Sequence, residues 1–433
     1  MSLTASTHNG WMPIPSKTRF ALATAALMFV FASRGTPAAA QPAGTDAASK
    51  PSAPSQPSES PLQVPLGVTY SAWRGGFAQA EQRLLVFKNT GFRLVSLVPA
   101  YPYVGLNDVD LNAGPSPEEL GAAVEAALRM GLQVVIKPHL EPLLHTPGFN
   151  SFTNENASWR ARCSWRGYFD VDPMTVAYRE GILFSTLNAL KNVFNHIGDL
   201  DGKSVVRLDL GAELMNAVVY APAQWEKLLR AVQRERDRLG LRKRVALSHN
   251  FSHHFEIAQD FVDRMDARGR AALGRYLRGL DGIAISQYMD LTVAVPAAER
   301  GKRMPTPDEI AQALVIAERN VRNDILIKRL GMRDTQIPPL HLGEFGIGLG
   351  GLQHPNLWSG NTSKDYNARL PAAIAQGHRG LLRYLSMSQA EGRTVQTAVL
   401  WVTGMYYDVF GWGNVSYGVP EAAEVLRAGM RSH

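Results

Sequence analysis

The sequence is poor in cysteine, since Cys163 is the only one among 433 residues. A disulfide within the chain is therefore impossible, and so are the four-cysteine and CxxC sites that hold zinc. Nucleotide-binding loops are missing too: WRGGFAQ at 73–79 does not fit GxGxxG, and no P-loop occurs. The GxSxG motif of serine hydrolases is also absent. The chain must build its core without disulfides, and its chemistry without these motifs.

The sequence has little charge of either sign, and charged residues make up 19% of it against 45% apolar residues. This is the composition of a globular protein of enzyme size. The formal net charge is +7, but Lys17, Arg19 and Arg34 lie in the first 40 residues, which contain no acid. The other 42 basic and 38 acidic residues nearly balance. Such a mild, scattered excess predicts no nucleic-acid partner, and LRKR at 241–244 is expected to be a solvated helix end.

The N-terminus reads as a secretory signal. Two basic residues precede the apolar run FALATAALMFVFA at 20–32, and small residues end at Ala40, where we expect cleavage. The run is short for a membrane span, so we expect a secreted or periplasmic protein without stable membrane insertion, with an uncleaved anchor as the alternative. Residues 41–64 are rich in Pro, Ser and Ala and predict a disordered linker. Residues 65–433 are expected to form one domain.

From residue 66 onward, short apolar runs rich in Val, Ile and Leu alternate with longer helical stretches. Near-continuous apolar strands separated by helices predict a parallel sheet that is covered on both faces. Two helix starts are explicit, because SPEE at 116–119 and TPDE at 306–309 each combine a capping hydroxyl, proline and glutamate. The expected strands are 66–73, 92–99, 132–138, 204–213, 244–250, 281–288, 337–345 and 395–402.

Eight strand–helix units are the number that closes a (β/α)8 barrel, and the domain has a suitable length. The α/β class is therefore predicted as a TIM barrel, with an open doubly wound sheet as the alternative. In such a barrel, function lies at the carboxyl ends of the strands. The polar and aromatic residues expected there are Trp73, Arg74, Tyr101, Tyr103, Lys137, His139, Glu213, Asn216, His249, Asn250, Gln287, Tyr288, Glu344 and Trp401.

Two glutamates, Glu213 and Glu344, each close an apolar run, where a buried carboxylate is costly unless something requires it. A pair of carboxylates at one barrel mouth suggests glycoside hydrolysis, with one acting as acid and the other as nucleophile or base. Two nearby charges also separate their pKa values. The alternative is that each glutamate pairs with an Arg or Lys in a structural salt bridge.

Several short motifs occur along the chain: LVPAYPY, VVIKPHL, SWRG, LGAEL, GIAISQY and GEFGIG. Their order resembles that of glycoside hydrolase clan A, and most closely family 113, known for endo-β-mannanase activity. The resemblance spans most of 66–415. It implies a retaining mechanism in which Glu213 is the acid/base and Glu344 the nucleophile. It also implies that Tyr288 contacts the nucleophile and that Trp401 lies under the sugar at the cleavage point.

The sequence departs from the clan pattern at both glutamates. Ala212 stands before Glu213, where many clan members have Asn and family 113 has Thr, so the usual contact to a sugar 2-hydroxyl is in doubt. Gly343 and Phe345 flank Glu344, where family 113 usually has Thr and Ile. The segment 141–170 carries Trp159 and Trp165 and suggests a differently built subsite. The substrate is therefore expected to be a β-linked polysaccharide, either β-mannan-like or a bacterial exopolysaccharide.

The residues expected to bind the substrate are Trp73, Lys137, His139, Trp165, Asn250, Tyr288 and Trp401, and no cofactor or metal is expected. Two rival interpretations stay open. His139, His249, His253 and His254 could hold a metal at the mouth of a metal-dependent hydrolase, although no HxH occurs on the first strand. The barrel could also be a non-catalytic carbohydrate-binding protein; the presence of both glutamates argues against this. The sequence does not address the oligomeric state, and the fold alone cannot decide the function.

Overall fold

The computed structural model describes residues 62–105, 108–142, 171–198, 205–251, 262–288, 294–299, 303–347, 363–392, 395–402, 409–412 and 418–431. All of them belong to one compact unit, Gln56–His433. A signal segment at 1–40 and a subsite at 141–170 were predicted from the sequence. The first segment lies wholly outside the described residues and the second almost wholly. Leu62 and Val64 are buried against the core, so the packed chain already includes the end of the expected linker.

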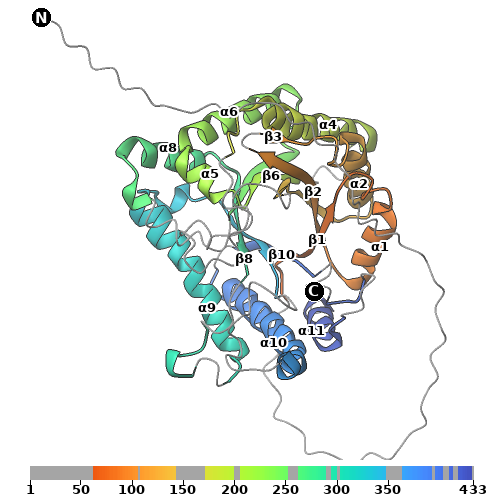
Figure 1. The fold of residues 1–433 in the computed structure, drawn as a ribbon, viewed down its shortest axis with the longest axis vertical. Coiled ribbons are helices and arrows are strands. Elements are labelled where there is room, and N and C mark those ends of the chain that lie inside the picture. Colours follow the sequence, from red (N-terminus) through yellow and green to blue (C-terminus); the bar gives the residue numbers. More distant parts are fainter. Residues whose placement is uncertain are drawn as a thin grey trace, which may run out of the picture. The chain divides into compact units, whose positions relative to one another are not determined.

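Eight parallel strands close into a barrel, which confirms the predicted fold (Figure 1). The sheet order is β1-β10-β9-β8-β7-β6-β4-β2, and β2 pairs again with β1. The barrel strands are β1 (Leu66–Ala72), β2 (Leu94–Gly105), β4 (Gln133–Ile136), β6 (Val206–Ala212), β7 (Val245–Phe251), β8 (Gly282–Gln287), β9 (Leu340–Phe345) and β10 (Val395–Leu400).

Helices surround the strands, as Figure 1 shows. Both predicted capping boxes form, at Ser116 before α2 and at Thr306 before α9. None of the described helices is long and apolar enough to cross a bilayer. The helices are α1 (Ala80–Thr90), α2 (Pro117–Arg129), α4 (Ser185–Ile197), α5 (Met215–Tyr220), α6 (Pro222–Arg238), α8 (Ala267–Arg278), α9 (Pro307–Arg319), α10 (Ser363–Ala390) and α11 (Pro420–Arg431), with π-helical turns at Ala177–Phe184 and Asn320–Arg329.

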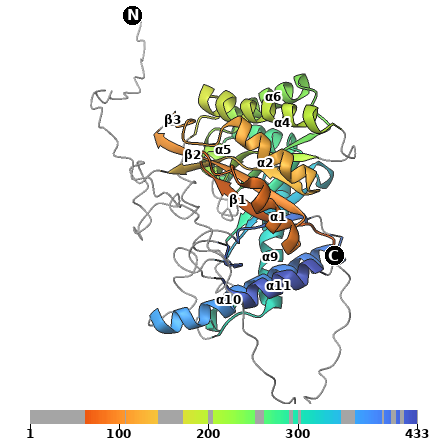
Figure 2. The same cartoon turned by 90° about the vertical axis from the view of Figure 1, so that its right-hand side faces the viewer.

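Strand β2 is longer than the sequence predicts, and it runs on past the barrel (Figure 2). Beyond Pro99 it pairs with β5 (His139–Pro142) and with β3 (Asp108–Val109). Strand β4 is shorter than predicted because Pro138 cannot donate to the ladder, and pairing resumes at His139. This break brings His139 to the rim of the barrel.

The inside of the barrel is mostly polar, unlike the branched apolar filling usual for this fold. Arg207 on β6 donates to Thr397 on β10, which lies diametrically opposite in the strand order, at 3.0 Å. A small apolar cluster, separate from the main core, is formed by Leu94, Val135 and Val399. Gly67 leaves room for it, because a Cβ at this position would lie 2.2 Å from Leu94 Cδ2.

We expect Gly67→Ala to destabilise the barrel by about 1–3 kcal/mol through overpacking against Leu94. Leu94→Ala alone should cost about 2–5 kcal/mol by leaving a cavity. The added methyl group at position 67 fills part of that cavity, so the double variant should lose less than the sum of the two. Urea unfolding measures all three.

Gly121 in α2 provides the control, since a Cβ there would lie at an ordinary 3.6 Å from Val193. Gly121→Ala should be neutral or stabilising by up to about 1 kcal/mol, because alanine favours a helix. Strictly additive losses for Gly67→Ala and Leu94→Ala would contradict the close packing inside the barrel.

Candidate active site

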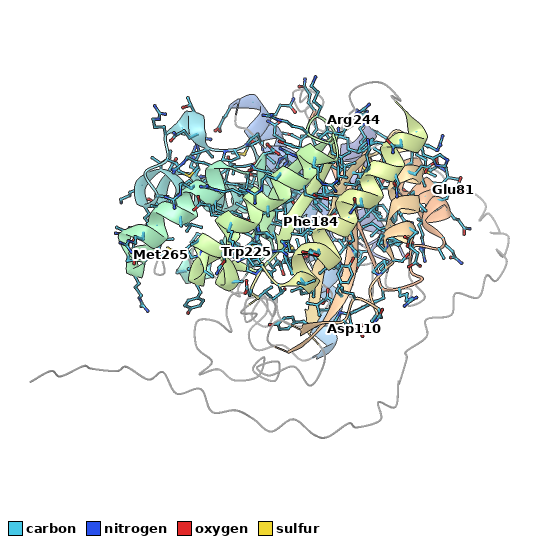
Figure 3. All side chains as sticks on the ribbon, turned by 90° about the horizontal axis from the view of Figure 1, so that it is seen from above. Glu81, Asp110, Phe184, Trp225, Arg244 and Met265 are labelled. Atoms are coloured by element: carbon cyan, nitrogen blue, oxygen red, sulfur yellow. The ribbon has the colours of Figure 1, made fainter. Side chains whose placement is uncertain are left out.

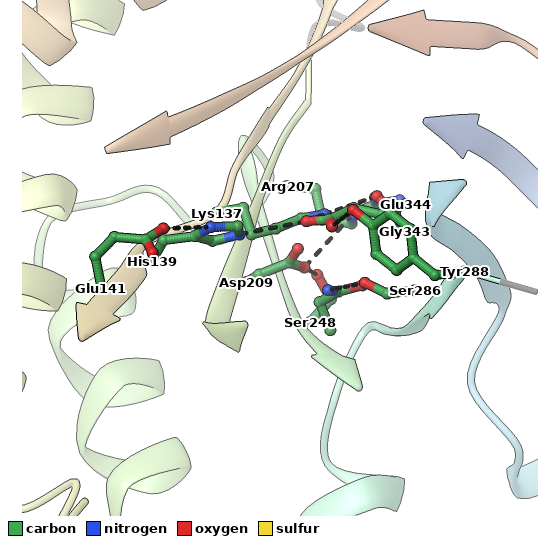
Figure 4. Close-up of polar contacts among 11 residues, drawn as sticks. Lys137, His139, Glu141, Arg207, Asp209, Ser248, Ser286, Tyr288, Gly343 and Glu344 are labelled. Atoms are coloured by element: carbon green, nitrogen blue, oxygen red, sulfur yellow. Dashed lines mark hydrogen bonds and ion pairs between the residues drawn. The ribbon is translucent and has the colours of Figure 1, made fainter. Parts of the chain in front are cut away.

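The centre of the site is an ion pair that crosses the barrel (Figure 4). Lys137 follows β4 and Glu344 lies on β9, and these two strands are opposite each other in the sheet order. Lys137 Nζ lies 2.8 Å from Glu344 Oε1 and donates a second hydrogen bond of 2.7 Å to the Gly343 carbonyl. The two side chains are 0% and 1% exposed, respectively. Water therefore does not screen this pair, and each charge depends on the other.

Two further groups contact the Glu344 carboxylate. His139 Nε2 lies 3.3 Å from Oε1, and the Tyr288 hydroxyl donates to Oε2. His139 is oriented from its other side, because its Nδ1 lies 3.3 Å from Glu141 Oε1. The half-buried Trp401 stacks on the His139 ring with centroids 5.9 Å apart. The carboxylate is thus held from β4, β5 and β8 at once, and an aromatic face lies beside it.

These contacts decide the charge of Glu344. Burial acts to raise the pKa of this carboxyl, but the Lys137 charge and the hydrogen bond and charge of His139 outweigh it. The pKa is therefore held well below its usual value. Glu344 is accordingly ionised throughout the neutral range, as a nucleophile or a charge-stabilising group must be. Its contribution to stability is complete above the unfolded-state pKa and is lost as the pH falls towards the folded-state value.

An irregularity in β9 aims the Glu344 side chain. Against β8, Ile285 pairs with Leu342 and Ser286 pairs with Glu344, so one residue of β9 is extra at Gly343. Such a bulge redirects the side chain that follows it. Gly343 is required there, because a Cβ would lie 1.9 Å from Asn250 Oδ1. The departure from the family pattern at this position therefore has a local cause, which is the Asn250 amide packed against the strand.

Glu213 follows β6 and has the only positive φ, +58°, among the described residues other than glycine. Its backbone N–H donates to the Asn250 carbonyl on β7 at 2.7 Å, and the residue is 3% exposed. The pairing of β6 with β7 is irregular between Asp209 and Ala212, directly before it. A left-handed backbone costs a residue with a side chain about 1–2 kcal/mol. Strain of this kind gathers at functional sites, and both candidate glutamates follow an irregular strand.

The other predicted binding residues fall into different surroundings. Trp73 is 44% exposed directly after β1 and is free to contact a ligand. Lys137 and Asn250 are fully buried, and Asn250 Nδ2 donates to Ser286 Oγ at 2.8 Å. Both therefore hold the site in shape from beneath. Trp165 lies outside the described residues.

The prediction that places His249 at the barrel mouth was wrong. Strand alternation turns His249 to the opposite face from Asn250, where it packs against Trp225 and contacts the Tyr276 hydroxyl at 2.8 Å. Burial lowers the pKa of His249 to about 3, so it is a neutral core residue. His249 is therefore not available to a ligand at the mouth. Tyr101 is also buried, and burial raises its pKa to about 12; its position at the mouth stays a prediction.

A metal site receives no support from the described part of the chain. No three His, Cys, Asp or Glu side chains within it converge as ligands, and His249 faces the helices. His253 and His254 lie outside it.

A second polar group lies beneath the site and was not predicted from the sequence. Asp209 accepts a hydrogen bond from the Ser248 hydroxyl, and Arg207 Nε lies 3.8 Å from Asp209 Oδ1. All three side chains point into the barrel (Figure 4). The signal was present as polar residues within apolar strands, in RLD at 207–209 and LSHN at 247–250. We interpret the group as support for the floor of the site.

A groove on the outer wall has a volume of about 690 Å³, between α2 and α4. Glu118, Asn188 and Asn192 are among the residues that line it, and none of the candidate site residues is. The buried and strongly perturbed carboxylate at the mouth is the better indication of chemistry than this open groove.

We expect Lys137→Met to leave the Glu344 charge buried without its main partner. The free energy of unfolding should fall by about 3–5 kcal/mol at neutral pH. The pKa of Glu344 should rise. As the pH is lowered, any activity that needs the ionised carboxylate should therefore be lost at a higher pH than in the unmodified chain. Urea unfolding and a pH–rate profile measure the two effects. Lys88→Met on the exposed face of α1 is the control, and an unchanged acid limb in Lys137→Met would refute the assigned role.

We also expect Glu213→Gly to be more stable than Glu213→Ala by about 0.5–1 kcal/mol, because glycine adopts a positive φ without steric cost. Both variants lack the carboxylate, so we expect no corresponding difference between their activities. At Glu235, inside α6, the order should reverse, because glycine weakens a helix. Equal stability of the two Glu213 variants in urea unfolding would mean that the backbone there is not strained.

The sequence matches no family model and no curated protein. Among solved structures, a GH113 β-1,4-mannanase has 17% sequence identity and a TM-score of 0.50, and the alignment covers 86% of this chain and 100% of that one. The GH113 β-mannanase AaManA from Alicyclobacillus acidocaldarius, in complex with ManMIm, has 14% identity and a TM-score of 0.48 over 86% and 98% of the chains. The GH53 catalytic domain from Ignisphaera aggregans has 14% identity and a TM-score of 0.45 over 86% and 96%.

At this level of identity the likeness concerns the fold. It confirms, for the fold, the resemblance to clan A that the motifs indicated: the chain has the (β/α)8 architecture of a GH113 β-1,4-mannanase along that protein's full length.

Proposed function

We propose that this protein is a retaining glycoside hydrolase that cleaves a β-linked polysaccharide. Glu344 is the nucleophile and Glu213 is the acid/base. The observation that carries the proposal is the carboxylate of Glu344, which is buried at a strand end, kept ionised by Lys137 and His139, and contacted by the Tyr288 hydroxyl. A purely structural ion pair would not need the additional Tyr288 contact or a bulge that redirects the side chain.

In the first step, Glu344 attacks the anomeric carbon while the bond from that carbon to the leaving oxygen breaks. Glu213 gives its proton to the leaving oxygen, so the departing sugar is neutral. In the second step, a water molecule gives a proton to Glu213 and its oxygen attacks the anomeric carbon, which frees Glu344 as a carboxylate. Two inversions give net retention, and this requires the two carboxyl groups to lie about 5–5.5 Å apart.

Lys137 has a distinct part in this sequence. Once Glu344 is bound to the sugar it is a neutral ester, and the buried Lys137 charge loses its partner. An uncompensated buried charge is costly, so the covalent intermediate is destabilised relative to the free carboxylate. The ion pair therefore promotes the second step, because hydrolysis restores it.

For the substrate, we propose a β-mannan-like polysaccharide or a bacterial exopolysaccharide. Trp401, stacked on His139 beside the nucleophile, supplies an aromatic face for the sugar at the cleavage point, and the exposed Trp73 supplies one at the rim. The proposal includes export after cleavage at Ala40. N-terminal sequencing of the exported chain checks this, and retention of 20–32 would indicate an anchor instead.

The division of roles predicts different kinetics for two variants. Glu344→Ala should abolish turnover on all substrates, and azide or formate should restore some activity with inverted product. Glu213→Ala should keep the first step on a substrate with a nitrophenolate leaving group but slow the second, so the glycosyl-enzyme should accumulate as a burst. On natural substrates it should lose about 10²–10⁴-fold.

Glu141→Gln is a matched control, because it lies one contact further from the nucleophile and should retain turnover. Equal losses for both glutamate variants on both substrate types would contradict the separate roles. Full activity in either would remove that glutamate from the mechanism and favour a non-catalytic carbohydrate-binding barrel.

A further inference from the structure

The net positive charge of the chain is concentrated on one part of the helical wall. Residues 222–251 and 262–281 contain 13 basic and 6 acidic residues, whereas the whole chain contains 45 and 38. The remaining sequence therefore has 32 of each, and its net charge is zero. Glu256 and Asp260, between the two ranges, reduce the excess of the continuous stretch from seven to five.

The helices that carry this charge, α6 and α8, pack side by side (Figures 1 and 3). The carboxylate of Glu226 on α6 accepts hydrogen bonds from Arg230 on the same helix and from Arg275 on α8, the latter at 2.9 Å through each oxygen. Further along, Gln233 Nε2 donates to the Gly279 carbonyl at 2.9 Å. These links place the basic rows of the two helices next to each other.

Four basic side chains of this face have neither an ion pair nor a hydrogen bond with any described residue. They are Lys227 and Arg234 on α6, and Arg268 and Arg278 on α8. Arg278 is half-buried and the other three are exposed. Lys227 and Arg234 are seven residues apart, which keeps them on the same side of α6, whereas Arg268 and Arg278, ten residues apart, are rotated from each other by about 80° around α8. The face therefore presents free cations, whereas many other surface arginines of the described chain are neutralised by a neighbouring carboxylate.

The chemistry of the face favours a hydrophilic polyanion. Three of the four free cations are arginines, which match carboxylate and sulfate groups through two parallel hydrogen bonds. The large exposed apolar side chains among the described residues lie on other elements, so α6 and α8 lack the apolar contacts that insert into a membrane. Stacking of single-stranded bases would need exposed aromatic side chains, and neither helix presents one in the described chain.

We propose that the outer face of α6 and α8, called here the α6–α8 face, is a second binding surface for an acidic polysaccharide that carries carboxylate or sulfate groups. The choice of a polysaccharide among polyanions rests on the proposed function. Each helix of a (β/α)8 barrel starts near the mouth, so Lys227 lies towards the active-site end of this face. A polymer bound along the wall would stay close to the mouth, which raises its effective concentration there.

The test measures binding of the full chain to polygalacturonate by affinity electrophoresis at low and high salt. The variant combines Lys227→Gln, Arg234→Gln, Arg268→Gln and Arg278→Gln. Removal of these four ion contacts should weaken binding by about tenfold or more at low salt. High salt should weaken binding by the unmodified chain towards the level of the variant. Neutral β-mannan should show no such loss.

The matched control combines Lys88→Gln, Lys191→Gln, Lys328→Gln and Arg431→Gln, which change the net charge equally on α1, α4, the 320–329 turn and α11. None of these side chains has an ion pair with a described residue, and three are exposed while one is half-buried, as in the test variant. Its affinity should change by less than about twofold at moderate salt, since exposed charges act over about 10 Å. Thermal unfolding shows that both variants fold, and the pair Lys227→Gln with Arg234→Gln replaces the fourfold variant if it does not.

Three outcomes would overturn the proposal: equal weakening in test and control variants, no retention of the unmodified chain by polygalacturonate, or equal or tighter binding to duplex DNA or to anionic phospholipid vesicles. Repeating the binding in a Glu344→Gln background separates this proposal from the catalytic one. Binding that persists there while no polysaccharide is hydrolysed by the unmodified chain would refute the proposed function and leave the α6–α8 face intact.

Discussion

The ion pair between Lys137 and Glu344 sets the constraint on which the rest of the site depends. Two opposite charges that are almost inaccessible to water stabilise each other only when the geometry is held closely, and removal of either leaves the other uncompensated. The barrel meets this condition by placing the two residues at the ends of opposite strands. His139 and Tyr288 then fix the remaining freedom of the carboxylate. The neighbouring charges thus keep Glu344 ionised although it is buried away from water.

The same constraint explains the unusual interior. If Leu, Ile and Val filled the barrel, the Lys137 charge would lie among apolar side chains. In this barrel, polar side chains surround it instead. The Asn250 amide lies close against Gly343 and donates to Ser286, so one glycine and one bulge allow the strand to turn its glutamate inwards. Below this level, Arg207, Asp209 and Thr397 continue the polar filling. The apolar filling detected inside the barrel is the cluster of Leu94, Val135 and Val399.

The mouth and the α6–α8 face have different kinds of charge. The mouth has buried, paired charges, as the proposed cleavage of one bond requires, while the α6–α8 face includes unpaired charges that suit the many weak contacts of the proposed polymer binding. The two differ in their response to salt, because buried pairs are screened little and exposed charges are screened strongly. Basic and acidic residues balance over the rest of the chain, so the excess of positive charge on this face belongs to two neighbouring helices.

The sequence by itself determined the architecture. Eight apolar runs and two complete capping boxes agree with the observed strands and helix starts, because alternation of buried strands with capped helices is a local, repeated signal. It also singled out Glu344, Tyr288 and Trp401, since polar or aromatic residues at the ends of apolar runs are rare enough to notice. Tertiary structure alone decided which side chains meet. The local sequence does not reveal that Lys137 pairs with Glu344, 207 positions away. It also does not reveal that Asn250 faces inwards while His249 faces the helices, or that the Asn250 side chain leaves room only for glycine at position 343. These depend on strand register and on bulges, where a shift of one residue reverses the face on which a side chain lies.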